Sequence, residues 1–179
     1  MEKSRTRIIS YKDFLDGSEK PSLRPAIWKW KDVGPELIES AKDNGFLREG
    51  RGAVSYVHAD TGEALGICPS LNMLVQVFGP GVHNAAHRHS NLALFIVKEG
   101  EGYSIIDGEK IEWAAGDVFF APPWSAHEHC NTSDTERAIL YTIQDVPAVA
   151  RMGVSFFEQP VDSGPKHVVA QRKDEPATG

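Results

Sequence analysis

Hydrophobic residues in the middle of the chain fall into short runs that are separated by turn residues. Eight such runs lie between about residues 51 and 145: AVSYVHA, SLNMLVQVFG, LALFIVKEG, GYSIIDG, EKIEWAA, DVFFAP, AHEHCNT and ERAILYTIQD. Glycine, proline, asparagine or aspartate separates most of them, and Asp107-Gly108 is a typical hairpin turn. Short strands at this spacing, without helices between them, predict an all-β sandwich or barrel.

The segment PELIESAKDNGFL, before the first strand, has the pattern of a short helix. Leu37, Ile38 and Ala41 recur with helical spacing. Pro35 suits the first turn of such a helix, and an Asn-Gly pair follows that suits its end. We therefore expect one helix ahead of the barrel.

The chain is predicted to hold one domain with an appended segment at each end. Its 179 residues fit a single domain of ordinary size, and the sequence contains no internal repeat. We expect an N-terminal arm and helix over residues 1–50, a barrel over residues 51–158, and a flexible polar tail over residues 159–179.

Composition and charge exclude several classes of function. With 19 Lys and Arg against 25 Asp and Glu, the net charge is -6, which argues against binding to nucleic acid. No apolar run approaches the roughly 18 residues that a membrane-spanning helix needs. Two cysteines cannot form a disulfide framework, and the N-terminus does not have the pattern of a signal peptide. We expect a cytoplasmic protein.

The histidines are unevenly distributed, since five of the seven lie between His83 and His129. His87 and His89 are two residues apart, as are His127 and His129, and residues at this spacing share one face of a strand. An antiparallel barrel can bring two such strands together. Three imidazoles would then bind one divalent metal, for which Fe, Zn, Cu and Ni are all suitable. The alternative is that both pairs are ordinary surface or core residues.

The spacing around these histidines resembles the two motifs of the cupin superfamily. Residues 81–89 read G-x5-H-x-H, and residues 116–131 read G-x5-P-x4-H-x3-N. The resemblance implies a double-stranded β-helix, or jelly-roll, barrel with a metal inside. The first cupin motif usually carries a glutamate ligand four or five positions after its second histidine, where this chain has Ala93 and Leu94. The resemblance therefore implies a three-histidine centre, formed by His87, His89 and His127.

A longer stretch of the sequence resembles one cupin family in particular. The string AHRHSNLALFIVKEGEGY, followed by GD and P-x-W-x-x-H-x-H, is similar to the gentisate 1,2-dioxygenase family, which includes salicylate and 1-hydroxy-2-naphthoate ring-cleaving enzymes. The flanking segments LRPAIWKWKDVGPELIESA and QDVPAVARMGVSFFE look like the family's entry and closing segments. The resemblance implies an Fe(II)-dependent dioxygenase that opens a hydroxylated aromatic ring with O₂. Zn, Ni, Mn and Cu remain possible occupants of the metal site.

The same resemblance assigns expected roles to residues around the metal. His129 matches a family histidine that lies beside the substrate, where a hydrogen bond or acid/base assistance suits an imidazole. Arg51 lies near the position of a family arginine that binds substrate, although Arg48 competes for this role. Phe95 stands where the family usually has a second arginine, which favours a substrate that depends less on a carboxylate. Trp124 is expected to form part of an aromatic substrate pocket.

The sequence is also compatible with two other functions, and its length bears on the oligomeric state. A three-histidine cupin can carry other chemistry, as a thiol or diketone dioxygenase or a lyase, and a third class is a cupin that binds small molecules without turnover. Family members commonly have two cupin units, and this chain has room for one. We therefore expect a homodimer or higher homo-oligomer, with the WKWKDV segment as the contact arm.

Overall fold

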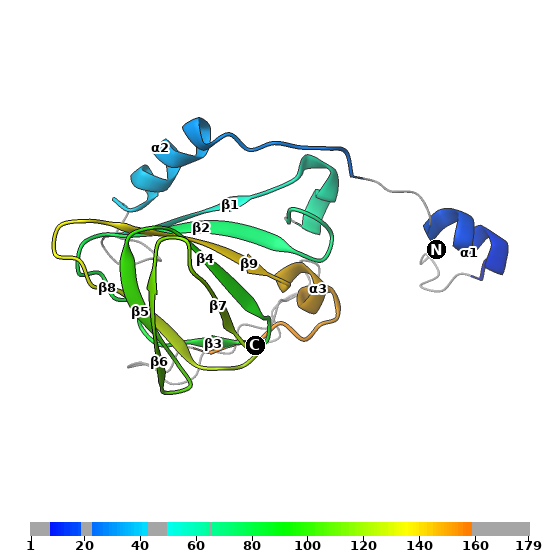
Figure 1. Ribbon diagram of the computed structural model, residues 1–179. Helices are drawn as coiled ribbons and strands as arrows, with labels where there is room; N and C mark the ends of the chain where they lie inside the picture. Colours follow the sequence, from blue (N-terminus) through cyan, green and yellow to red (C-terminus); the bar gives the residue numbers. More distant parts are fainter. Residues whose placement is uncertain (1–7, 19–22, 43–49, 65, 159–179) are drawn as a thin grey trace, which may run out of the picture.

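The computed structural model describes residues 8–18, 23–42, 50–64 and 66–158. Antiparallel strands are the main secondary structure of the described residues (Figure 1). The strands are β1 (Arg51–Tyr56), β2 (Asn72–Phe78), β3 (Arg88–His89), β4 (Ala93–Glu99), β5 (Glu101–Ile106), β6 (Glu109–Ala114), β7 (Val118–Ala121), β8 (His127–Asn131), β9 (Ala138–Gln144) and β10 (Phe157–Glu158). The helical elements are α1 (Tyr11–Ser18), α2 (Trp30–Ser40), the 3-10 segment η1 (Ala59–Ala64) and α3 (Val146–Arg151).

Two sheets form the walls of a barrel. The larger sheet has the strand order β1-β2-β9-β4-β7, and the smaller has the order β6-β5-β8. Isolated bridges from His83 to Cys130 and from His87 to His127 attach the residues before β3 to the free edge of β8. Strands β3 and β10 form a separate pair. This arrangement confirms the prediction of an all-β double-sheet barrel.

Alternation along each strand separates an interior face from an exterior face. The interior cluster is built from every second residue of strands in both sheets, and it holds Phe78, Phe95, Val97, Trp113, Phe119 and Leu140 among others. One end of the interior is therefore filled with apolar side chains. Toward the other end the same faces carry polar side chains, among them Gln76, Thr142 and the histidines of β8.

Helix α2 covers the outer face of the larger sheet, and a second apolar cluster lies between them (Figure 1). Leu37 of α2 is fully buried against outward residues of β1, β2 and β9. The helix approaches β1 so closely that a Cβ atom on Gly52 would come 2.6 Å from the backbone nitrogen of Ala41. Only glycine is compatible with this distance, so Gly52 allows the helix to rest on the sheet.

The observed helix differs from the expected one at its N-terminus. It begins at Trp30, and Pro35 therefore lies inside it rather than in its first turn. Proline removes one helical hydrogen bond there, and the amphipathic contact that buries Leu37 outweighs this loss. The expected Asn-Gly stop, Arg48 and the tail over residues 159–179 lie outside the described residues.

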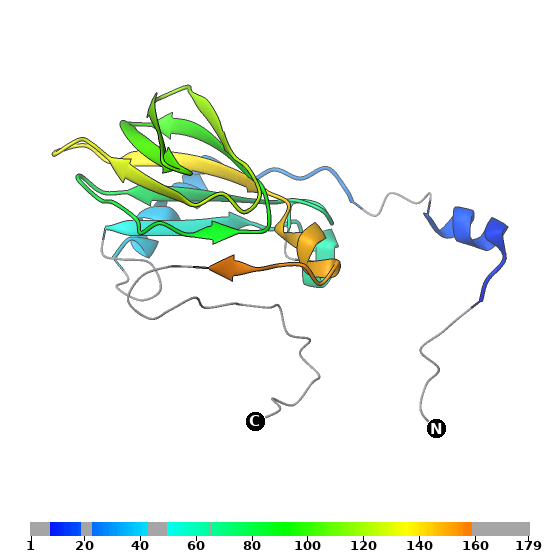
Figure 2. The same ribbon diagram turned by 90° about the horizontal axis from the view of Figure 1, so that it is seen from below.

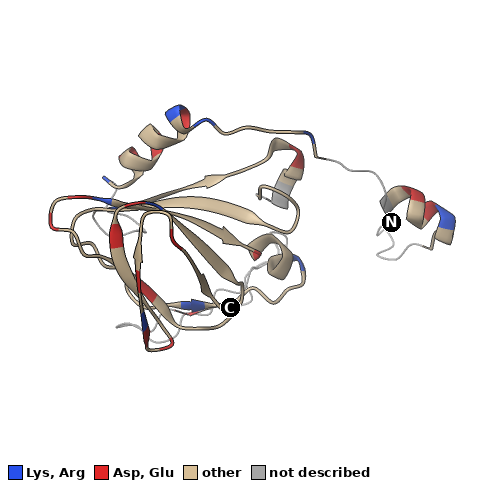
Figure 3. Cartoon of the chain, in the orientation of Figure 1, with Lys and Arg blue, Asp and Glu red and all other residues tan. Residues whose placement is uncertain are grey.

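The segments around the barrel are attached to it by specific contacts. The Arg24 side chain donates to Asp60 at 2.9 Å, and the Trp28 indole donates to the backbone oxygen of Val57, so residues 23–29 follow the barrel edge. Helix α1 stands apart from the barrel in both views (Figures 1 and 2). Acidic and basic residues are interspersed over the outer elements (Figure 3). Among the described residues, no helix is both long and apolar enough to span a membrane.

After α3, the described part of the chain returns along the barrel as far as β10 (Figure 2). In the register of the two strands, Phe157 is opposite His89 and Glu158 is opposite Arg88. The side chains of Glu158 and Arg88 also form an ion pair. Ser90 adds three further hydrogen bonds. Its backbone nitrogen donates to the backbone oxygen of Phe156, and its hydroxyl donates to the backbone oxygen of Val154 and accepts from the backbone nitrogen of Phe156. We call residues 154–158 the closing segment.

Leu37→Ala tests whether α2 is part of the folded core. The substitution leaves a cavity under the helix, and we expect it to lower the free energy of unfolding by about 3 kcal/mol. Ile38→Ala is the matched control, because its side chain is 36% exposed, and it should cost less than about 1 kcal/mol. Urea denaturation of both variants measures the difference. Equal losses would show that α2 is not held by its buried face.

Candidate metal centre

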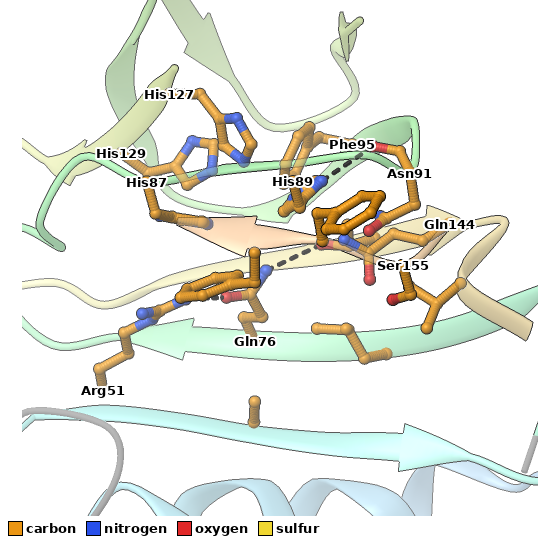
Figure 4. Close-up of a pocket in the computed structure, with 16 residues that line it drawn as sticks. Arg51, Gln76, His87, His89, Asn91, Phe95, His127, His129, Gln144 and Ser155 are labelled. Atoms are coloured by element: carbon orange, nitrogen blue, oxygen red, sulfur yellow. Dashed lines mark hydrogen bonds between the residues drawn. The ribbon is translucent and has the colours of Figure 1, made fainter. Parts of the chain in front are cut away.

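A cavity of about 430 Å³ lies inside the barrel, a volume that suits a small organic ligand. Inward residues of β1, β2 and β9 form one wall, and the histidines of β8 form another (Figure 4). The closing segment contributes Ser155, Phe156 and Phe157 to its lining. The cavity is therefore bounded by both sheets and by the last described part of the chain.

Three histidines meet at this cavity. His87 and His127 are directly opposite each other in an antiparallel bridge, and each backbone nitrogen donates to the other's carbonyl oxygen, at 3.1 and 2.8 Å. Their ring centroids are 4.4 Å apart, and the ring of His89 lies 4.7 Å from that of His127. One ring nitrogen of each residue lies within 4.8 Å of the corresponding atoms of the other two. The two-residue spacing of His87 and His89 thus brings both to one side.

Backbone carbonyl groups fix which nitrogen of each ring faces the others. The Nδ1 atoms of His87, His89 and His127 lie 3.1, 2.8 and 2.9 Å from the carbonyl oxygens of Ala85, Asn91 and Ser125, respectively. A carbonyl oxygen only accepts hydrogen bonds, so each Nδ1 must carry the proton and donate it. Each Nε2 atom therefore keeps its lone pair, as a metal ligand requires.

Burial keeps these three rings neutral. Together with the neighbouring imidazole of His127, it lowers the pKa of His87 to about 3. Burial also lowers the pKa of His127 to about 4 and brings the pKa of His89 below its ordinary value. Neutral, deprotonated Nε2 atoms are the form that binds a divalent transition metal, and the group contains no carboxylate. The donor set therefore fits a three-imidazole metal centre.

His129 lies on the same strand and face as His127, but it has a different environment. Its ring centroid is 4.5 Å from that of Phe95 and 5.6 Å from that of His127. Its Nδ1 contacts the hydroxyl of Ser104 at 2.7 Å rather than a backbone carbonyl. Burial, followed by the nearby imidazoles and Arg51, holds the pKa of His129 well below its ordinary value. The ring is a neutral group that lines the cavity beside the three-histidine cluster.

Arg51 places a positive charge in the cavity wall, opposite the histidines (Figure 4). One of its terminal nitrogens donates to Gln76 at 2.6 Å, and its Nε atom is buried without a hydrogen-bond partner among the described residues. Burial lowers the pKa of Arg51 to about 10, so the group stays charged at neutral pH. The described residues include no acidic side chain in an ion pair with it. A buried cation in this state favours an anionic ligand.

Phe95 and Trp124, the other expected substrate residues, have different positions. Phe95 is 2% exposed, lines the cavity and stacks on Phe119 with ring centroids 4.7 Å apart. Trp124 is 39% exposed and does not belong to the cavity lining. Its backbone has a φ of 66°, and its ring lies 4.7 Å from the guanidinium of Arg88. The chain turns the indole outward, so the cavity wall has phenyl rings where an indole was expected.

Several polar groups around the cavity were not expected from the sequence. Gln76 links Arg51 to the Thr142 hydroxyl, to which its amide donates at 2.9 Å. Asn84 accepts from the backbone nitrogen of His129 at 2.6 Å and so secures the residues before β3 to β8. Polar residues at inward positions of otherwise apolar strands are a signal that could have identified Gln76 and Thr142. The carbonyl groups behind the histidines have no such signal, because any residue type supplies them.

Comparisons with known proteins agree with this geometry. A family model described as "Cupin domain" matches residues 74–144. The chain is 32% identical to a 5-nitrosalicylic acid 1,2-dioxygenase from Bradyrhizobium sp over 162 residues. This matched region covers 88% of this chain and 77% of that protein. The chain is 33% identical over 147 residues to a gentisate 1,2-dioxygenase from Streptomyces sp, which covers 79% of this chain and 40% of that protein.

A solved structure shows the same fold. The crystal structure of a variant of salicylate 1,2-dioxygenase from Pseudoaminobacter salicylatoxidans superposes with a TM-score of 0.70 at 25% identity, over 86% of this chain and 48% of that one. This chain spans less than half of that enzyme and of the Streptomyces gentisate 1,2-dioxygenase, but about three quarters of the Bradyrhizobium enzyme. The expected family is confirmed: the chain belongs to the cupin superfamily and, within it, to the gentisate 1,2-dioxygenase family of ring-cleaving dioxygenases.

Proposed function

We propose that this protein is an Fe(II)-dependent dioxygenase that opens the ring of a hydroxylated aromatic compound. The observation that carries the proposal is the cluster of three neutral imidazoles, each with Nε2 free, at a cavity that also holds a buried cation. His87, His89 and His127 would hold the iron. When bound, ferrous iron would supply the redox chemistry that activates O₂, together with open positions for both reactants.

The walls of the cavity support an aromatic substrate with one anionic group. Arg51 would bind a carboxylate, since its fork of N–H groups includes a buried donor that has no partner in the part of the chain that the structure describes. Phe95 and Phe157 offer apolar surfaces to the cavity, with ring centroids 6.2 Å from that of His127 and 5.6 Å from that of His87, respectively. A single cation suits a substrate with one carboxylate, and an uncharged ring substituent would lie against Phe95.

His129 would contact the substrate rather than the metal. It lines the cavity next to the ligand cluster and is neutral, so it can donate a hydrogen bond to a substrate oxygen. The cavity walls would exclude water and hold the two reactants together, which is the main contribution that a protein makes to a cofactor-dependent reaction.

We further propose that residues 51–158 form the catalytic barrel and residues 1–50 an N-terminal arm and helix, and that the exposed parts of this arm contact another copy of the chain in a homodimer or higher homo-oligomer. Exposed apolar residues on α1 support this, because Tyr11 is 75% exposed on an element that stands apart from the barrel (Figure 1). We place the protein in the cytoplasm, and its two free cysteines, Cys68 and Cys130, suit a reducing compartment.

Oxygen uptake tests the proposed reaction. The Fe(II)-loaded protein should consume one O₂ per ring opened with at least one member of a panel that contains gentisate, salicylates, 1-hydroxy-2-naphthoate and hydroquinone. Arg51→Met should raise KM for a carboxylated substrate about 10- to 100-fold, because a charge-assisted hydrogen bond is lost.

Arg137→Met is the matched control for this variant. Arg137 is an exposed cation that pairs with Glu99 on the outside of the barrel, and its removal should leave KM unchanged. No uptake with any aromatic compound would refute ring cleavage. Uptake with an unchanged KM in Arg51→Met would refute the role of Arg51 alone.

Metal content tests the division of roles among the histidines. His87→Ala removes one of three ligands, and we expect iron binding to fall to less than a tenth of one ion per chain after desalting. His129→Ala should retain a full complement of iron and lose turnover. Elemental analysis and oxygen uptake on the same samples separate the two effects. Equal loss of iron from both variants would contradict the proposed ligand set.

The stability of the metal-free protein should depend on pH through the same rings. The folded-state pKa values of His87 and His127 are about 3 and about 4, below the value of about 6.5 in an unfolded chain. Between these limits the unfolded chain binds more protons, so the free energy of unfolding falls as the pH falls below about 6.5. Each ring contributes a slope of up to about 1.4 kcal/mol per pH unit.

Urea denaturation in the presence of a chelator, between about pH 7.5 and pH 5, measures this slope. His87→Gln removes one of the titrating rings and should give a flatter dependence than the parent chain. The carboxylates titrate equally in both proteins and therefore cancel in the comparison. A slope that is identical in the two proteins would contradict neutral burial of His87.

A further inference from the structure

His129 has a hydrogen-bonding arrangement that is opposite to that of the three ligand histidines. We propose that Ser104, held in place by Trp113, fixes His129 with its proton on Nε2, so that His129 donates a hydrogen bond into the cavity and cannot become a fourth metal ligand. Ser104 and Trp113 are then positioning residues for His129. The part of this proposal that concerns the substrate rests on the proposed function, whereas the position of the proton does not.

The direction of each hydrogen bond follows from the groups involved. The indole Nε1–H of Trp113 can only donate, and it lies 3.0 Å from Oγ of Ser104. The Ser104 hydroxyl has one proton, and the residue is fully buried. Among the described residues, Nδ1 of His129 at 2.7 Å is the acceptor within reach of that proton. Because an unsatisfied buried hydroxyl is costly, Ser104 donates to Nδ1, and the single proton of the neutral ring lies on Nε2.

This arrangement separates His129 from its neighbours on the same face. His127 is two residues away, but a backbone carbonyl accepts from its Nδ1 and leaves its Nε2 free for a metal. In His129, the nitrogen that remains for the cavity carries a proton and has no lone pair for a metal. The identity of the group behind each ring, carbonyl or hydroxyl, thus decides whether the ring binds a metal or donates a hydrogen bond.

The strand register and a stack of aromatic rings hold Trp113, Ser104 and His129 in place. Ser104 of β5 is directly opposite His129 of β8. Trp113 of β6 lies over Gly102, where a Cβ atom would come 2.5 Å from the indole ring. Trp113 is nearly parallel to Phe119, with centroids 6.3 Å apart, and Phe119 stacks on Phe95, which contacts His129. The imidazole is therefore fixed by a hydrogen bond on one edge and by the tilted rings of Phe95 and Phe119 that pack against it.

Nitrogen-15 NMR of the full-length chain, labelled in histidine and loaded with Zn(II) alone, tests the position of the proton directly. His129→Gln identifies the signals of His129 by their absence. We expect His129 to carry its proton on Nε2, and the ligand histidines to carry theirs on Nδ1. His58 is an internal reference for the Nε2 form, because its Nδ1 accepts from the backbone of Asp60 and its Nε2 lies 2.7 Å from the Arg24 carbonyl oxygen. A proton on Nδ1 of His129 in the parent chain would overturn the proposal, regardless of the activity of any Ser104 variant.

Variants of the serine test the consequence for the reaction. Ser104→Ala should keep its metal content and KM and lose about tenfold in kcat, the equivalent of one lost hydrogen bond. Ser104→Thr, which keeps the hydroxyl, should recover most of the rate. Thr61→Val is the matched control, because it removes a buried hydroxyl outside the cavity, and its kcat should be unchanged.

The outcomes distinguish this proposal from the proposed function. If Ser104→Ala folds, binds metal and turns over at the parental rate, the positioning role of Ser104 is wrong. If Ser104→Ala loses its metal, Ser104 acts on the ligand set and the proposal is also wrong. If the parent chain opens no aromatic ring but shows the Nε2 proton on His129, the proposed function fails while the assignment of the proton stands.

Discussion

The antiparallel bridge between His87 and His127 is the contact on which the metal centre depends. It joins two segments that are forty residues apart, and its two backbone hydrogen bonds set the separation and direction of both rings. Because side chains alternate along a strand, this one register also places His89 and His129 at the cavity. A shift of one residue would turn every one of these rings away from the interior. Asn84 opposes such a shift, because it binds the backbone of His129.

Desolvation lowers the pKa of both kinds of basic group in the cavity, but the resulting charge states differ. Burial makes protonation of the histidines unfavourable and so keeps them ready for a cation. The same burial leaves Arg51 charged, because an arginine pKa of about 10 is still far above neutrality. The charged guanidinium of Arg51 and the neutral imidazoles then face each other across one small cavity. Such a cavity is complementary to an anion that also binds a metal, as an aromatic hydroxy-carboxylate does.

The strand pattern was sufficient to predict a β sandwich or barrel, and the histidine spacing placed each pair on one face of a strand, because both depend on the period of two along a strand. The choice of His87, His89 and His127 as one cluster came from the resemblance to the cupin motifs. The tautomers of the ligand histidines could not be predicted, because they are set by backbone carbonyl groups, which every residue type has. The position of Trp124 could not be predicted either, because a local turn with positive φ directs its ring outward. Helix α2 begins before Pro35 because the packing of Leu37 outweighs a local preference.

The closing segment contributes three residues to the cavity lining but none to the two apolar clusters of the barrel. It is attached through β3 and Ser90, at the edge of the fold. Substitutions in this segment can therefore reshape the space beside the three-histidine cluster without loosening the scaffold that positions the histidines. In evolutionary terms, part of the ligand preference is encoded outside the residues that stabilise the fold, so the shape of the cavity can change at Phe156 or Phe157 while the barrel is preserved.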